Sequence, residues 1–155
     1  MIDHTRRSSV SSALCYRDPK AAFRWLEQAF GIEPLFVILY KDGNLVHSEM
    51  QFGGGTIMVG GEWSEKHKSP ASTGGVNTQS VHLQMGSGID EHCARARQAG
   101  AVILQEPETQ FYGDRTYRAA DLEGHIWTFG QMVKVMTSAE WDAASGLITK
   151  ERLDP

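Results

Sequence analysis

The sequence predicts an α+β protein made of two βαβββ modules, and three observations support this fold class. The chain has 155 residues, about the length of one domain that can bury its own core. Segments with strand and helix periodicity follow one another in the order β-α-β-β-β, and this order occurs twice. The halves also match in their glycine turns, since Gly31 corresponds to Gly100 and Gly55 to Gly124, which indicates an internal repeat.

The first module is expected over about residues 9–61. After an opening strand, Asp18 can cap a helix and Pro19 suits its first position. Gly31 is typical of the residue that ends a helix, and the Asp-Gly pair at 42–43 indicates a hairpin turn. The expected elements are a strand over 10–16, a helix over 19–30, and strands over 34–40, 44–52 and 56–60.

A polar stretch over 62–79 has no regular periodicity and is expected to form a linker or flap. The second module is expected over about 80–131. Its helix contains Ile89 and Cys93 and ends at Gly100. The expected strands cover 80–85, a segment beginning at 102–104, 116–120 and 125–130.

The tail over 132–155 contains a capping-box pattern from Thr137 to Glu140, which predicts a short helix. Its apolar face would consist of Trp141, Ala144 and Ile148. Exposed apolar faces of this kind mark contacts with other surfaces. We therefore expect it to pack on its own domain or on a second subunit.

Composition excludes several classes of function. The net charge is −4, and the sequence has no basic stripe. A nucleic acid or an anionic membrane is therefore not expected as a partner. The longest apolar run, 35–40, is far shorter than a membrane span, and the N-terminal segment lacks a signal-peptide core.

Cys15 and Cys93 fit no paired spacing and are expected to be reduced, which favours a cytoplasmic protein. The glycine run at 53–55 lacks the lysine and helix of a phosphate loop, so nucleotide binding is not expected.

Two segments carry a family resemblance over roughly residues 10–131. The opening reads LCYRDP at 14–19, and the closing segment reads YGDRTYRAADLEGHIWTFG at 112–130. Together they resemble the vicinal oxygen chelate superfamily of glyoxalases, bleomycin-resistance proteins and extradiol dioxygenases, and most of all its PhnB-like branch. The resemblance implies that 1–155 form one domain, a homodimer, with a small molecule bound inside curled sheets.

The resemblance also implies where a metal would be bound. Metal-dependent members place one ligand on the first and last strand of each module, and here the matching positions fall near Ser11, Met58, Ser80 and Thr128. None is a strong ligand for a divalent metal, so no cofactor is expected. An alternative set of two histidines and one carboxylate, His47, Glu49 and His82, would suit non-haem iron.

Strand alternation places several polar side chains on the face that would line the cavity. His82 is the candidate for acid–base chemistry, with Glu49 expected beside it as a second catalytic group. The candidate ligand-binding residues are His47, Gln84, Met58, Tyr112, Arg118 and Thr128. Trp63, Phe111 and Tyr112 are expected to flank the opening, while Asp114 and Arg115 are expected to form an ion pair that holds their loop, or else a ligand clamp.

Two classes of function follow from this pattern. The first is a metal-independent protein that binds a small molecule, akin to drug-sequestering resistance proteins. The second is an enzyme, either a metal-dependent lyase or isomerase of the glyoxalase type or an extradiol-type dioxygenase. The missing ligand positions favour the first class, and the His47, Glu49 and His82 group favours the second.

Overall fold

The computed structural model describes residues 8–153, which form eight strands, three α-helices and one short 3-10 turn. In chain order these elements are β1 (Ser11–Tyr16), α1 (Pro19–Phe30), β2 (Glu33–Leu39), β3 (Leu45–Phe52), β4 (Gly55–Gly61), η1 (Pro70–Ser72), β5 (Val81–Met85), α2 (Ile89–Gln98), β6 (Val102–Thr109), β7 (Asp114–Ala120), β8 (Ile126–Met132) and α3 (Ser138–Ser145).

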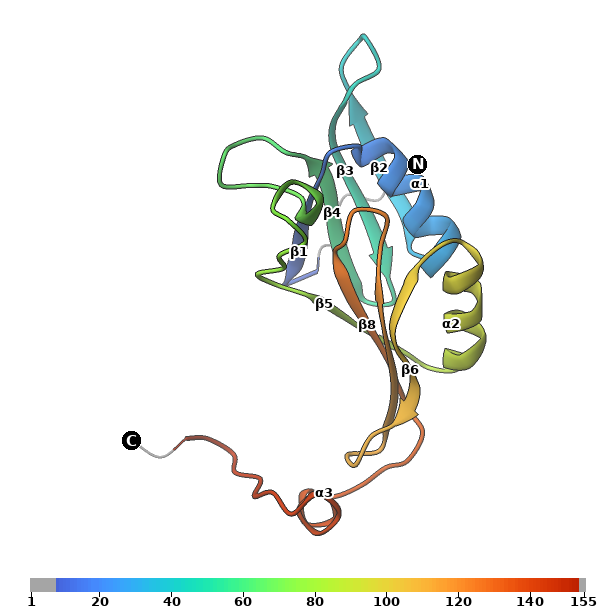
Figure 1. The fold of residues 1–155 in the computed structure, drawn as a ribbon, viewed down its shortest axis with the longest axis vertical. Coiled ribbons are helices and arrows are strands. Elements are labelled where there is room, and N and C mark those ends of the chain that lie inside the picture. The colour runs from blue at the N-terminus through green and yellow to red at the C-terminus, as the bar shows by residue number, and fades with distance from the viewer. Residues whose placement is uncertain (1–7, 154–155) are drawn as a thin grey trace.

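The strands form two sheets with the same topology. The first has the order β1-β4-β3-β2 and the second the order β5-β8-β7-β6. In each sheet the module's first strand pairs in parallel with its last strand, and the remaining pairs are antiparallel. The predicted α+β fold of two βαβββ modules is confirmed, and the expected repeat is visible as two matching sheets (Figure 1).

The first helix begins and ends where its sequence signals predict. The Asp18 side chain accepts a hydrogen bond from the Ala21 amide at 3.0 Å, and Pro19 occupies the first turn. Gly31 ends the helix with φ at 67°, a left-handed conformation that a side chain would disfavour.

The helices α1 and α2 lie side by side (Figure 1), and each satisfies backbone groups of the other. Trp25 Nε1 in α1 donates to the Ala99 carbonyl after α2 at 2.7 Å. Arg95 in α2 donates to the carbonyls of Gln28 and Glu27 at 2.7 and 2.9 Å. These reciprocal bonds add partners to carbonyls at the C-terminal ends of both helices, and they join the two modules.

One hydrophobic core runs through both modules. The Phe30 ring of α1 lies 5.4 Å from Trp127 and 4.8 Å from Phe129 in β8. Tyr117 stacks on Phe129 at 5.0 Å. Because all four residues are buried, we infer that the modules fold as a single unit rather than independently.

The turn before β8 holds the start of the first module through one buried carboxylate. Asp121 Oδ2 accepts from the Tyr16 hydroxyl at 2.6 Å and from Trp127 Nε1 at 3.0 Å. Asp121 Oδ1 accepts from the backbone amides of Glu123 and His125, both at 3.0 Å. Burial, and then Asp121, raises the pKa of Tyr16 well above its ordinary value, so its phenol remains a hydrogen-bond donor.

His92 is a partly buried histidine with both ring nitrogens in use. Its Nε2 donates to the Phe30 carbonyl at 2.7 Å, and its Nδ1 accepts from the Tyr117 hydroxyl at 2.6 Å. The Phe30 carbonyl can only accept, so Nε2 carries a proton, and in the neutral ring Nδ1 is then the acceptor. Burial lowers the pKa of His92, and Arg95 adds to that lowering.

We therefore expect the folded state to lose stability in acid partly through His92. A histidine whose pKa is lowered in the folded state contributes stability that is full above about pH 6.5, the unfolded value, and that falls as the pH drops below it. Melting temperatures of the wild type and of His92→Gln, measured from pH 8 to pH 5, check this. The variant should show the shallower slope, and equal slopes would contradict the assignment.

One strand begins as predicted and has an end that was not predicted, and one helix differs from its predicted form. Strand β6 continues to Thr109 through Pro107, which an edge strand tolerates because proline lacks only an amide donor. The last helix ends at Ser145, where Gly146 adopts φ of 73°. Ile148 therefore lies beyond the helix, and the expectation that it shares a helical face with Trp141 was wrong.

The tail leaves the two sheets, and α3 lies away from both modules (Figure 1). We call the start of this tail, Val133 and Lys134, its root. The root is held in place because both amides donate to the Gly113 carbonyl at 3.0 Å. Beyond this root the tail exposes apolar side chains, among them Val135 and Ile148. No helix within residues 8–153 is long and apolar enough to cross a membrane.

Candidate functional site

Each sheet has an inner face that the helices do not cover, and strand register defines a row of side chains across it. In the first sheet Ala13 pairs with Met58, Met58 with Glu49, and Glu49 with Phe36. We call these four residues the first row. Ile57 and Val59, which alternate with Met58 along β4, are buried in the core, so the first row lies on the opposite face.

The second sheet has a corresponding row. His82 pairs with Thr128, Thr128 with Arg118, and Arg118 with Gln105. We call these four residues the second row. The neighbours that alternate with them, such as Trp127 and Ala119, are buried in the core.

The two rows occupy equivalent positions but differ in chemistry. Each member of the second row follows its equivalent in the first by 69 or 70 positions in the sequence. In the first row Glu49 stands among apolar side chains, whereas in the second Arg118 stands among hydrogen-bonding ones. The central charge of the face is therefore reversed between the modules.

The register corrects the expected metal-ligand positions. Met58 lies beside Ala13 rather than Ser11, and Thr128 lies beside His82 rather than Ser80. The corrected set offers one imidazole, one thioether, one hydroxyl and one methyl group, which does not suit a divalent metal.

The alternative iron set is also not assembled. Glu49 is 8% exposed, and its Oε1 lies 3.1 Å from Nε2 of His47. A carboxylate this buried needs such a partner. The structure thus pairs Glu49 with His47 and not, as expected, with His82, and residues 8–153 contain no group of three or more His, Cys, Asp or Glu residues that could hold a metal ion.

His82 takes part in a polar chain on the second sheet. Its Nε2 donates to Gln84 Oε1 at 3.2 Å, and Gln84 Nε2 donates to Asp114 Oδ2 at 2.7 Å. Gly130 lies beneath this chain, and a Cβ there would stand 2.6 Å from Gln84 Oε1 and 3.1 Å from His82 Nε2. Gly130 therefore provides the space for these side chains. The sequence predicts Gly130 only as the end of a strand, so its role in making space for Gln84 and His82 was missed.

A cavity of about 380 Å³ lies over the first sheet. Its wall includes His47 and Met58 from the inner face and Trp63 from the start of the linker. The Trp63 ring stacks on His67 at 3.8 Å, which places an exposed aromatic surface at the edge of the cavity. Cys15 also lines it, and burial, followed by the charge of Glu62, raises the pKa of this thiol. Cys15 is therefore not a ready thiolate.

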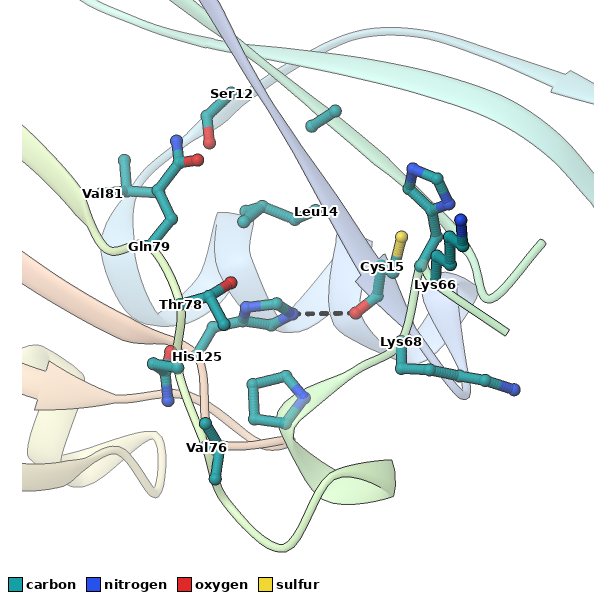
Figure 2. A pocket seen from close by; sticks show the side chains of 14 residues that line it. Ser12, Leu14, Cys15, Lys66, Lys68, Val76, Thr78, Gln79, Val81 and His125 are labelled. Atoms are coloured by element: carbon teal, nitrogen blue, oxygen red, sulfur yellow. Dashed lines mark hydrogen bonds between the residues drawn. The ribbon is translucent and has the colours of Figure 1, made fainter. Parts of the chain in front are cut away.

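A smaller cavity of about 180 Å³ lies between β1 and the linker (Figure 2). Thr78 and Gln79 border it, and His125 lies inside with its Nε2 donating to the Cys15 carbonyl at 2.8 Å. Because this bond holds β1 against the turn before β8, His125 has a structural role here.

Two further expectations concern the turn between β6 and β7. Asp114 and Arg115 do not pair with each other, because they are neighbours in β7 and point to opposite faces. Arg115 binds Asp90 at 2.9 Å, and Asp114 accepts from Gln84. Tyr112 packs edge-on against Phe111 at 5.2 Å and does not line the cavities over the first sheet.

Comparison with known proteins agrees with this architecture. An uncharacterized protein of Mycobacterium bovis is 31% identical over 140 residues, which cover 88% of this chain and 91% of that protein. The crystal structure of TioX from a Micromonospora species is 33% identical, covers 81% of this chain and 99% of that chain, and has a TM-score of 0.65. TnmS3, an antibiotic binding protein from a Streptomyces species, shares the fold at 18% identity, a TM-score of 0.62, and coverage of 83% and 99%.

Two βαβββ modules with uncovered inner faces define the fold shared by glyoxalases, bleomycin-resistance proteins and dioxygenases. The corresponding family model matches residues 2–129. The chain belongs to the Glyoxalase/Bleomycin resistance protein/Dioxygenase superfamily.

Proposed function

We propose that this chain binds a planar aromatic small molecule between the inner faces of its sheets and needs no metal to do so. The observation that carries the proposal is the corrected set of row positions, in which Ala13, Met58 and Thr128 offer no strong metal ligand. The cavity over the first sheet adds support, because it combines apolar walls with a few polar groups, as small-molecule sites do. The antibiotic-binding neighbour TnmS3 has the same fold.

The alternative is an enzyme of the same superfamily. The His47–Glu49 pair favours it, since a buried carboxylate that orients a half-exposed imidazole is a common arrangement for proton transfer. A lyase, isomerase or dioxygenase that depends on a metal would need ligands other than the row residues. We retain the PhnB-like branch and a cytoplasmic location as parts of the proposal.

We also propose that the protein works as a homodimer. The well-capped helix α3 belongs to a tail that extends away from its own modules (Figure 1). Helices this short are marginal on their own, and Ile148 beyond α3 is 82% exposed. A second copy of the chain would give this tail a surface to pack against.

The proposed function is tested by titrating a panel of planar aromatic antibiotics into protein treated with a chelator. Trp63 lines the cavity, so a bound ring should change the tryptophan fluorescence in a saturable way. We expect at least one compound to bind. Binding that appears only after a divalent metal is added would support the enzyme alternative and contradict the proposal.

For that compound, His82→Ala should weaken binding by roughly threefold to tenfold, the value of one hydrogen bond of about 0.5–1.5 kcal/mol. Its melting temperature should hardly change, because His82 is exposed on an inner face. His92→Ala is the contrasting control, since that ring is partly buried and packs against Phe129 of the core at 4.5 Å. It should lower the melting temperature and leave binding by the folded protein intact, whereas the same pattern for His82→Ala would rule out His82 as a ligand contact.

A further inference from the structure

Arg118 is an exposed cation at the centre of the second row without an acidic partner. Its one hydrogen bond within residues 8–153 runs from Nε to Thr128 Oγ1 at 3.4 Å. The ion pairs of that described region involve other residues. The acids on the same sheet face, Asp114 and Glu108, belong to other rows, and Asp114 is held by Gln84.

The surroundings of Arg118 are suited to an anion. Its neighbours in the row, Thr128 and Gln105, can both donate hydrogen bonds. A further cavity of about 350 Å³ opens beside it. Apart from Arg118, that cavity is lined by four polar residues at the end of the linker and one apolar residue: Asn77, Thr78, Gln79, Ser80 and Ile126.

The equivalent position in the first module excludes an anion. Glu49 occupies it, with Phe36 and Met58 as its neighbours in the row. A negatively charged group placed there would meet a buried carboxylate, and like charges repel most strongly where water is scarce. The charge reversal between the rows therefore gives the two inner faces different preferences.

We propose that the second row is an anion subsite in which Arg118 binds the carboxylate of an aromatic acid. The guanidinium can donate two parallel hydrogen bonds to a carboxylate, a geometry that lysine cannot reproduce. This inference rests on the proposed function, because it names the chemical class of the bound molecule.

The test uses two probes with the same ring, naphthalene-2-carboxylate and its neutral amide, naphthalene-2-carboxamide, each titrated by calorimetry at low salt. The acid should bind the wild type about tenfold to a hundredfold more tightly than the amide, as a charge-assisted pair would give. Arg118→Gln should reduce binding of the acid to the level of the amide, and Arg118→Lys should retain only part of the preference. Arg24→Gln, which removes an exposed arginine on α1, should behave like the wild type.

The outcomes separate this inference from the proposed function. If the wild type binds both probes equally, or if Arg118→Gln keeps the preference for the acid, the anion subsite is wrong while small-molecule binding stands. If neither probe binds at millimolar concentration, the subsite is also wrong, and the proposed function is then judged on the antibiotic panel. Circular dichroism of Arg118→Gln should match the wild type, because the side chain is exposed.

Discussion

Replacing Asp121 with alanine is expected to lower the free energy of unfolding by about 3–5 kcal/mol. The substitution removes the acceptor of four hydrogen bonds, two of which come from the buried side chains of Tyr16 and Trp127. A buried donor left without a partner costs about 1–3 kcal/mol. The loss should be measured by urea denaturation, and Tyr16→Phe should cause a smaller loss of about 1.5–3 kcal/mol.

The matched control is Asp90→Ala, which removes an aspartate whose partner is a surface cation. Asp90 is exposed and binds Arg115 at the surface, so its loss should change stability only slightly. If Asp121→Ala and Asp90→Ala proved equally mild, Asp121 would not be the link that holds β1 to the turn before β8. If Asp121→Ala does not fold, Asp121→Asn keeps one acceptor and should give an intermediate loss.

Replacing Gly113 with alanine is expected to release the root of the tail. A Cβ at this position would overlap the carbonyl oxygen of Lys134, and the residue has φ of 96°. The backbone strain costs about 1–2 kcal/mol, and the overlap adds about 1–3 kcal/mol or forces the tail away. Limited proteolysis should then cleave the segment after Met132 faster than in the wild type.

Gly43→Ala separates these two effects. Gly43 has a similar φ of 86°, yet nothing lies within 4 Å of a Cβ built there. Gly43→Ala should lose only the stability that the backbone strain costs, with unchanged cleavage of the tail.

Light scattering on both variants also tests the dimer. The wild type and Gly43→Ala should have twice the chain mass of 17.2 kDa, and Gly113→Ala should have a lower mass. Equal cleavage and equal mass in the two variants would contradict both expectations.

Much of the fold could be predicted from local signals. Asp18 and Gly31 mark the ends of the first helix because capping depends on a few neighbouring atoms. Period-two alternation correctly separated the buried neighbours of β5 and β8 from His82 and Thr128, since alternation follows from strand geometry itself.

The alignment between strands could not be predicted from the same pattern. A shift of two residues keeps every side chain on its face. Alternation alone therefore cannot tell whether Ser11 or Ala13 pairs with Met58, or whether Ser80 or His82 pairs with Thr128. Partners distant in sequence also left no local signal. The four bonds to Asp121 and the space above Gly130 arise only when separate segments meet.

The reversed charges of the two rows have an evolutionary consequence. A protein assembled from two identical half-chains would present the same row on both sheets, so a ligand could enter in either of two orientations. Once the halves are joined in one chain, codons 49 and 118 can change independently. Glutamate at one position and arginine at the other would break that degeneracy, and duplication followed by divergence would then give a directional site from a symmetric ancestor.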